Sequence, residues 1–232
     1  MTEELEAKGR KCLVFAPENK EVEKLPLLII NGSSGGSEFF KEQKLLPREN
    51  CLSVLIMSDN WNDDFTPWAG EALNAKTGPF GGRADEYISF LKDELLPLIK
   101  EKYCRQNENI PCGIWGQSLG ALFNLYLYTK EPELFSHYAC ISPSLWYEGW
   151  TDYFEKNISS LPPKNWFISC GNREGKKCRD ARKETVPKFE KLLELLKENG
   201  HKVTSCEDSG DHFNFIYQRC QKAFEYMDKN LK

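Results

Sequence analysis

Short apolar runs alternate with longer amphipathic stretches along the 232-residue chain. Each run is too short to form a helix, and such runs are typical of strands that a sheet buries on both faces. We therefore predict strands over residues 11–17, 27–31, 52–57, 112–115, 138–142, 166–170 and 202–206.

Apolar residues at helical spacing fill most of the intervals between these runs. They predict helices over residues 83–103 and 183–199, a helix from residue 216 to the C-terminus, and another that ends near residue 130. Pro97 should kink the first helix because proline has no main-chain N–H to donate. Strands that alternate with helices after a single leading strand predict the α/β class, with a mostly parallel central sheet and helices on both faces.

Two long segments, 58–82 and 142–164, interrupt this alternation and are rich in aromatic residues. A long irregular segment inside a compact domain is usually functional or disordered, and the aromatic residues favour the first. We interpret both as excursions near a substrate site within a single domain that spans residues 1–232. Their aromatic side chains either line that site or pack on the sheet, and the candidates for lining it are Trp61, Trp68, Trp146 and Tyr147.

Composition and charge narrow the classes of partner. The net charge of −4 comes without a basic stripe, so no nucleic-acid partner is expected. The sequence shows neither a signal peptide nor a run of about 18 apolar residues, which favours a cytoplasmic protein without a membrane partner. Nine scattered cysteines without a Cys-x-x-Cys pair indicate reduced thiols, and neither a metal nor a cofactor is expected. No oligomeric state is predicted.

The clearest chemical signal is the pattern Gly-x-Ser-x-Gly formed by Gly116, Ser118 and Gly120, between a predicted strand and a predicted helix. In that context the serine lies on a sharp turn whose flanking positions should leave no room for a Cβ atom. A serine hydroxyl is a weak nucleophile at neutral pH and needs an adjacent base, which in turn needs an orienting acid. Ser118 is the predicted nucleophile.

Three histidines are available as the base. His137 and His201 open predicted strands, where a structural role is expected. His212 follows the last predicted strand, so it should emerge at the same edge of the parallel sheet as Ser118. His212 is therefore the predicted general base.

The orienting acid should follow the strand that precedes the histidine strand, because this fold places its residues in the order Ser, Asp or Glu, His. Glu174 is the first carboxylate after that strand and is the predicted acid. Asp180 is the reserve. Asp208 and Asp211 lie too close to His212 in sequence to be the first choice, although local geometry could allow either.

An oxyanion hole needs two N–H donors that are fixed in advance. One should be the N–H of Leu119, which follows the nucleophile at the start of a helix. The other should come from the glycine-rich loop 32–36, where Ser33 is the first choice and Ser34 the second. This loop lacks the lysine of a phosphate-binding loop.

Several segments spread over nearly the whole length carry a family resemblance: 27–32, 64–67, 81–87, 90–95, 116–120, 142–146 and 171–174. On these segments the chain resembles the putative-esterase branch of the α/β-hydrolases, which includes enterochelin esterases and esterase D. The resemblance implies an α/β-hydrolase fold and ester hydrolysis through an acyl-enzyme at Ser118, with Glu174 and His212 completing the triad.

The function predicted from residues and resemblance together is a serine carboxylic-ester hydrolase acting on a small-molecule ester. One alternative is an acyltransferase that uses the same triad and passes the acyl group to a sugar or another alcohol. A siderophore trilactone esterase is a narrower version of the first prediction. A catalytically silent hydrolase fold that serves as a binding module is the alternative from another class.

Overall fold

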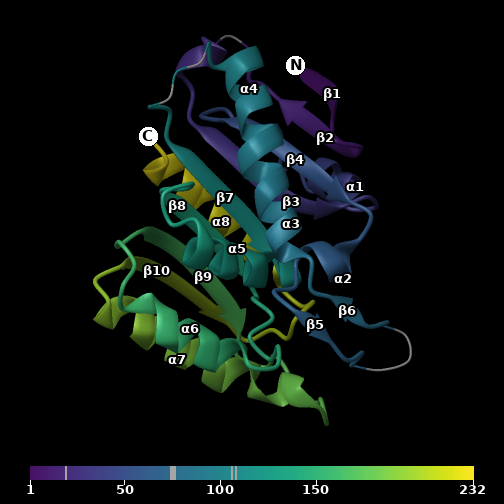
Figure 1. Cartoon of the computed structure of the whole chain (residues 1–232), viewed down its shortest axis with the longest axis vertical. Helices are drawn as coiled ribbons and strands as arrows, with labels where there is room; N and C mark the ends of the chain where they lie inside the picture. The colour runs from purple at the N-terminus through teal and green to yellow at the C-terminus, as the bar shows by residue number, and fades with distance from the viewer. Residues whose placement is uncertain (19, 74–76, 106, 108) are drawn as a thin grey trace.

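A mostly parallel eight-stranded sheet forms the centre of the computed structural model, which describes residues 1–18, 20–73, 77–105, 107 and 109–232 (Figure 1). In spatial order the strands are β1 (Thr2–Ala7), β2 (Arg10–Phe15), β4 (Leu52–Ser58), β3 (Leu27–Ser33), β7 (Cys112–Gln117), β8 (His137–Ile141), β9 (Asn165–Gly171) and β10 (Lys202–Asp208). All neighbours from β4 to β10 pair in parallel, while β1 and β2 are antiparallel to their neighbours. The predicted α/β class and parallel sheet are confirmed.

Helices cover both faces of the sheet, as the alternating pattern predicts (Figure 1). One face packs against α3 (Ala84–Ser89), α4 (Leu96–Tyr103), α5 (Leu119–Lys130), α6 (Trp150–Ile158) and α7 (Thr185–Glu198). The other packs against α1 (Ser37–Glu42) and α8 (Ile216–Asn230). Successive strand residues point to opposite faces, so Leu28 and Ile29 are both fully buried in different layers.

The prediction of a single leading strand is wrong, because β1 and β2 form an antiparallel hairpin. The turn uses Lys8 and Gly9, both with positive φ. The strand β1 reads Thr-Glu-Glu-Leu-Glu-Ala, and its glutamates hide the apolar alternation from a sequence search. Charged side chains on an edge strand deter pairing with another chain, which explains why a strand can be so polar.

The helix predicted over 83–103 is divided rather than simply kinked. A π-helical turn, Phe90–Leu95, joins α3 to α4. In this turn the N–H of Leu96 donates to the carbonyl of Leu91, five residues earlier. Pro97 comes directly afterwards and has no N–H, so the wider turn lies where the ordinary hydrogen-bond ladder is interrupted in any case.

The two aromatic segments lie beside the carboxyl ends of the strands. Segment 58–82 holds the short helix α2 (Trp61–Asp64) and the two-stranded sheet of β5 (Ala69–Gly70) and β6 (Phe80–Gly81); residues 74–76 of this segment lie outside the described residues. Arg10 on β2 anchors it, since its guanidinium donates to both carboxylate oxygens of the buried Asp64. Segment 142–164 contains α6.

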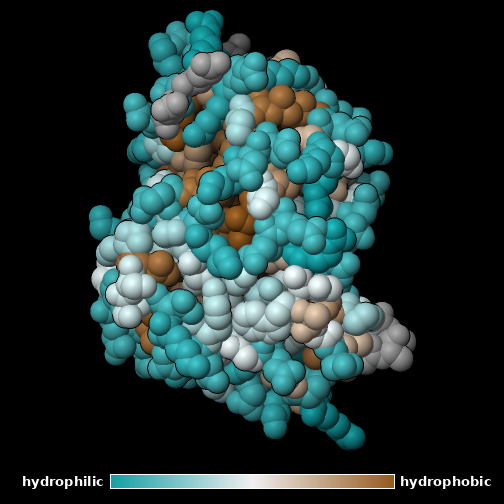
Figure 2. Space-filling view, viewed as in Figure 1, coloured by the Kyte–Doolittle hydropathy of each residue, from teal (hydrophilic) through white to brown (hydrophobic). Residues whose placement is uncertain are grey.

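The face seen in Figure 2 is mostly hydrophilic, with hydrophobic residues showing mainly in the recesses between polar ones. This matches a core that lies between the sheet and its two helical layers. Across the described ranges, no helix combines the length and the apolar character needed to cross a membrane.

Candidate active site

Ser118 lies on the sharp turn between β7 and α5. Its backbone has φ 55° and ψ −119°, a conformation that non-glycine residues rarely adopt and that costs about 1–3 kcal/mol. A Cβ on Gly116 would lie 2.4 Å from the carbonyl oxygen of Gly120, so glycine is required there. The same expectation is wrong for Gly120, where a Cβ would meet Asn31 Cβ at an ordinary 3.4 Å.

His212 lies against the serine. Its Nε2 is 3.1 Å from Ser118 Oγ, and its Nδ1 is 2.7 Å from Glu174 Oε2. Because the carboxylate can only accept, Nδ1 carries the proton and Nε2 is free to accept from the serine hydroxyl. The structure therefore brings together the three side chains predicted from sequence, at the ends of β7, β9 and β10.

Glu174 is buried, with 2% of its surface exposed, and is not a solvated loop carboxylate. Burial alone would raise the pKa of this carboxyl. Hydrogen bonds from His212 and from the Gly171 N–H, which donates to Oε1 over 2.9 Å, hold the pKa below its usual value instead. Glu174 is therefore a carboxylate that remains ionised at neutral pH.

The reserve carboxylates have other partners. Asp180 caps a short helical turn and pairs with Arg182. Asp208 accepts from the Gly210 N–H, and Asp211 accepts from the N–H groups of Phe213 and Asn214. These two aspartates shape the loop that carries His212.

Two further residues of the site escaped the sequence argument. Arg219 on α8 is fully buried and donates to Glu174 Oε1 over 3.0 Å. A sequence signal for it exists: position 219 lies on the apolar face that Ile216, Cys220 and Ala223 define, and a charged residue there needs a buried partner.

Ser144 is the second unexpected residue. It is fully buried, its Oγ lies 3.2 Å from Ser118 Oγ, and its N–H donates to the Ser118 carbonyl. The hydroxyl of Ser144 can donate to Ser118 Oγ while the hydroxyl of Ser118 donates to His212. Ser144 lies in segment 142–146, which the sequence alone marks only as part of a family resemblance.

The N–H of Leu119 comes at the first position of α5, where a helix leaves its N–H groups without intrahelical acceptors. In the loop after β3, the Ser34 N–H is already used, because it donates to the Ser58 carbonyl of β4. Successive N–H groups of a strand point to opposite sides, so the Ser33 N–H faces away from β4, toward β7 and the turn that carries Ser118. This favours Ser33 over Ser34 as the second donor.

A buried chain of neutral hydrogen bonds holds the end of β3. Tyr87 donates to Asn31 Oδ1, Asn31 Nδ2 donates to Asn124 Oδ1, and Asn124 Nδ2 donates to the Ala139 carbonyl. All three side chains are fully or almost fully buried. These hydrogen bonds tie the end of β3 to α5 and β8, and β3 and α5 are the elements that carry the two candidate oxyanion donors.

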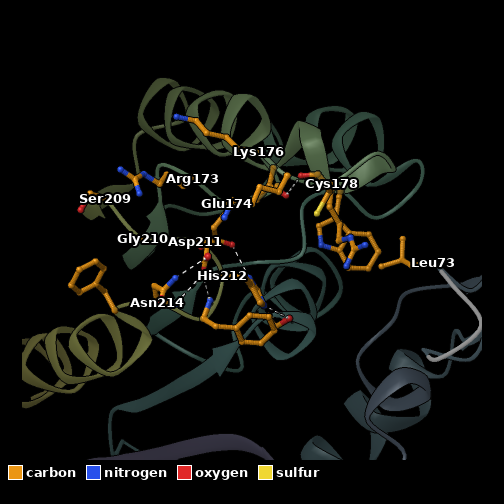
Figure 3. Close-up of a pocket in the computed structure, with 18 residues that line it drawn as sticks. Leu73, Arg173, Glu174, Lys176, Cys178, Ser209, Gly210, Asp211, His212 and Asn214 are labelled. Atoms are coloured by element: carbon orange, nitrogen blue, oxygen red, sulfur yellow. Dashed lines mark hydrogen bonds and ion pairs between the residues drawn. The ribbon is translucent and has the colours of Figure 1, made fainter.

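A cavity of about 810 Å³ opens beside the serine and histidine, and Trp146, Phe213 and Phe215 form part of its wall. Figure 3 shows Glu174 and His212 together near its centre, with Arg173 and Lys176 further out. A smaller cavity of about 430 Å³ adjoins it along Trp146.

The four candidate aromatic residues, Trp61, Trp68, Trp146 and Tyr147, divide between lining a cavity and packing in the protein. Trp68, Trp146 and Tyr147 border the smaller cavity. Tyr147 is nevertheless almost fully buried and donates from its hydroxyl to the Trp68 carbonyl. Trp61 packs edge-on against Phe65, with ring centroids 4.7 Å apart. Packing therefore explains Trp61, whereas Trp146 borders both cavities.

Comparison with known proteins decides the family. The sequence matches the family described as Putative esterase over residues 6–216. The chain belongs to the putative esterase family. This confirms the resemblance drawn from the sequence and, with the sheet order, the predicted α/β-hydrolase fold.

Three known proteins show how far the similarity extends. Uncharacterized protein YbbA of Bacillus subtilis (strain 168) is 31% identical over 163 residues, 69% of this chain and 63% of that protein. Ferri-bacillibactin esterase BesA of the same organism is 28% identical over 67% of this chain and 55% of that protein. The chain thus spans less than two thirds of the length of both. A solved IroE-like serine hydrolase from Shewanella oneidensis has the same fold, with a TM-score of 0.81 at 16% identity over 99% of this chain and 80% of that chain.

The other two histidines of this esterase-family chain lie away from the serine. His137 Nδ1 is 2.9 Å from the hydroxyl of Ser136. His201 Nδ1 accepts from the Lys164 N–H and from Trp166 Nε1, both at 3.0 Å, and Nε2 lies 3.3 Å from the Tyr128 hydroxyl. Both have structural roles, as predicted.

His201 gives the fold an acid sensitivity that can be measured. Burial lowers the pKa of His201 to about 4, and a proton on Nδ1 would break two hydrogen bonds. The unfolded histidine titrates near 6.5, so this contribution to stability is complete above about pH 6.5 and is lost as the pH falls toward 4, by roughly 3 kcal/mol. Urea unfolding at pH 7, 5 and 4 should show that His201→Asn, which cannot titrate, loses less stability than the wild type. Equal losses would contradict this explanation.

No group of three or more His, Cys, Asp or Glu side chains within the described ranges is arranged to hold a metal ion.

Proposed function

We propose that this chain is a serine carboxylic-ester hydrolase. The observation that carries the proposal is the unbroken series of hydrogen bonds from Ser118 through His212 to the buried Glu174. In such an arrangement the base is in contact with the nucleophile and the acid orients the base. The silent binding module requires a broken triad, and distances of 3.1 Å and 2.7 Å give that alternative no support.

In the proposed reaction His212 Nε2 accepts the proton of Ser118 as Oγ attacks the ester carbonyl. The N–H groups of Leu119 and Ser33 hold the negative charge that develops on the carbonyl oxygen. Protonated His212 then donates to the departing alcohol, which leaves an acyl group on Ser118. In the second half, His212 takes a proton from water as its oxygen attacks the acyl carbonyl. The bond to Ser118 Oγ then breaks, His212 returns the proton to that oxygen, and the carboxylic acid leaves.

The wall of the larger cavity favours esters that carry negative charge. Arg173, Lys176 and Lys177 border it and all three are exposed, with Asp211 close enough to Lys177 to feel its charge. A local group of cations on a chain with net charge −4 attracts anionic ligands into the cleft. The similarity to a ferri-bacillibactin esterase makes an anionic siderophore ester one candidate within this class.

All nine cysteines lie within the described residues and none forms a disulfide, which supports a reducing compartment as the place where the enzyme works.

A panel of esters tests the proposed function. It should contain short nitrophenyl esters in matched neutral and carboxylate-bearing pairs, a siderophore trilactone and an acylated sugar. We expect hydrolysis of the neutral esters and a several-fold higher kcat/KM for the anionic member of each pair, an advantage that shrinks with added salt and in Lys176→Gln/Lys177→Gln.

Lys100→Gln/Lys102→Gln, which alters two lysines on α4, is the matched control. Product analysis with and without an added alcohol separates hydrolysis from acyl transfer. Absence of hydrolysis for every ester would overturn the proposed function, whereas equal rates for neutral and anionic pairs would overturn only the preference for anions.

A further inference from the structure

Arg219 occupies an unusual place for a cation, because it is fully buried between the two loops that carry the acid and the base. Nη1 donates to Glu174 Oε1 over 3.0 Å. Nη2 donates to two carbonyl oxygens of the histidine loop, those of Asp211 at 2.7 Å and Asn214 at 2.8 Å. These carbonyls belong to residues on either side of His212 in the sequence. A single guanidinium therefore bonds the acid and both flanks of the loop that carries the base.

Two glycines, Gly171 and Gly210, leave the space that this side chain occupies. A Cβ on Gly171 would lie 2.5 Å from Arg219 Nη1 and 2.4 Å from the Gly210 carbonyl oxygen. A Cβ on Gly210 would lie 2.3 Å from the Asn214 carbonyl oxygen. Glycine at both positions lets the end of β9 and the histidine loop approach closely enough for one guanidinium to reach both. The Arg173 N–H adds a main-chain link by donating to Gly210.

Stability alone is a weak reason to bury an arginine here. Removing a cation from water is expensive, and an apolar side chain of similar volume often stabilises a protein as well or better. The Nε atom of Arg219 is buried, and its nearest acidic oxygen, Asp208 Oδ2, is 3.6 Å away. What the guanidinium supplies, and an apolar residue could not, is several donors in one rigid plane.

We propose that Arg219 is a positioning residue for the triad, which fixes Glu174 and the His212 loop relative to each other and balances the charge of the buried carboxylate. This inference rests on the proposed function. The arginine contacts neither nucleophile nor substrate site, and acts through Glu174 and the two carbonyls. Holding reacting groups in place matters because a displacement of about 1 Å can cost 10²-fold in rate.

The charge of Arg219 also bears on the pH dependence. The groups that face the Glu174–Arg219 pair are His212 and Asp211 from the histidine loop, Asp208 from β10, Cys170 from β9 and Cys220 on α8. Burial raises the pKa of both thiols, so neither carries charge near neutrality. Without the guanidinium, no cation of α8 would face the buried carboxylate, so the pH profile of the reaction is a readout of the charge of Arg219.

The test compares Arg219→Met, which keeps bulk without charge, with Arg219→Lys, which keeps charge without the planar donors. For Arg219→Met we expect kcat to fall on the order of 10²-fold with KM within a few-fold of the wild type, and the acidic limb of kcat/KM to move to higher pH. Arg219→Lys should keep the wild-type acidic limb but lose about 10-fold in kcat, since a lysine cannot bond Glu174 and both carbonyls together.

A proton NMR readout is independent of turnover. The hydrogen between His212 Nδ1 and Glu174 Oε2 should give a far-downfield resonance in the wild type, assigned with ¹⁵N-histidine labelling. It should broaden or disappear in Arg219→Met. If the wild type hydrolyses no ester, the proposed function fails while this resonance still decides the role of Arg219.

Arg48→Met is the matched control, because Arg48 pairs with Asp228 of the same helix α8 far from the triad. It should lower the melting temperature and leave kcat, the pH profile and the resonance unchanged. The proposal is overturned if Arg219→Met behaves in the same way. Should Arg219→Met fail to fold, Arg219→Lys decides: a lower kcat with a weakened resonance supports positioning, and wild-type values of both refute it.

Discussion

Replacing Ser118 by alanine is expected to reduce ester hydrolysis roughly 10⁴-fold or more while the protein remains folded. The proposed mechanism passes through a covalent bond to Ser118 Oγ, and the neighbouring hydroxyl of Ser144, 3.2 Å away, hydrogen-bonds to that oxygen but is not the group paired with His212. Alanine removes the nucleophile and keeps a Cβ at this strained turn. Steady-state hydrolysis of a nitrophenyl ester, with circular dichroism as the check on folding, measures the effect.

A second substitution at the same position separates chemistry from strain. Ser118→Gly should be equally inactive yet more stable than Ser118→Ala, because glycine adopts a φ of 55° without steric cost. Ser160→Ala, at an exposed serine, controls for preparation effects. Hydrolysis that survives in Ser118→Ala at near the wild-type rate would refute the assignment of the nucleophile.

Replacing Glu174 by glutamine is expected to reduce kcat on the order of 10³- to 10⁴-fold. If the amide nitrogen faces His212, it donates to Nδ1, so the imidazole hydrogen moves to Nε2 and points at Ser118 Oγ instead of leaving a free acceptor. The same change removes the charge that balances the fully buried Arg219, and an uncompensated buried charge costs about 3–5 kcal/mol. Activity assays and urea unfolding should show both losses.

This double effect distinguishes Glu174 from a surface carboxylate. Glu133→Gln, at an exposed glutamate that pairs with Lys164, should change neither quantity by more than a small amount. Wild-type kcat in Glu174→Gln would mean that the carboxylate does not orient the base. An unchanged free energy of unfolding would mean that Arg219 does not depend on it.

The sequence predicts that Ser118, Glu174 and His212 lie together, and it does so mainly through topology. Parallel strands bring their carboxyl ends to one edge, so Ser118, Glu174 and His212 can be assigned by asking which polar residue follows which strand. With only three histidines, the assignment of the base has few alternatives. The apolar runs that predict the strands therefore also predict the edge of the sheet at which the three side chains lie.

The features that the sequence does not predict depend on the direction in which a side chain points, or lie at the edge of the sheet. The rotation of α8 about its axis turns Arg219 toward Glu174, and no local pattern specifies that partner. The glutamates of β1 mask the alternating pattern by which a strand is recognised in a sequence. That a Cβ fits at Gly120 can be learned only from its distance to Asn31 in the structure. Trp61 and Trp146 look equivalent in sequence, yet one packs on Phe65 and the other borders the cavity.

The hydrogen bonds that run from Tyr87 through Asn31 to Asn124 use two carboxamides and a phenol whose pKa burial raises well above its usual value. None of these groups gains or loses a proton between mildly acidic and strongly alkaline conditions. The amides proposed to hold the oxyanion are thus supported by groups that do not titrate in this range. We therefore expect the pH dependence of ester hydrolysis to report the proposed triad rather than a change in the turn beside it.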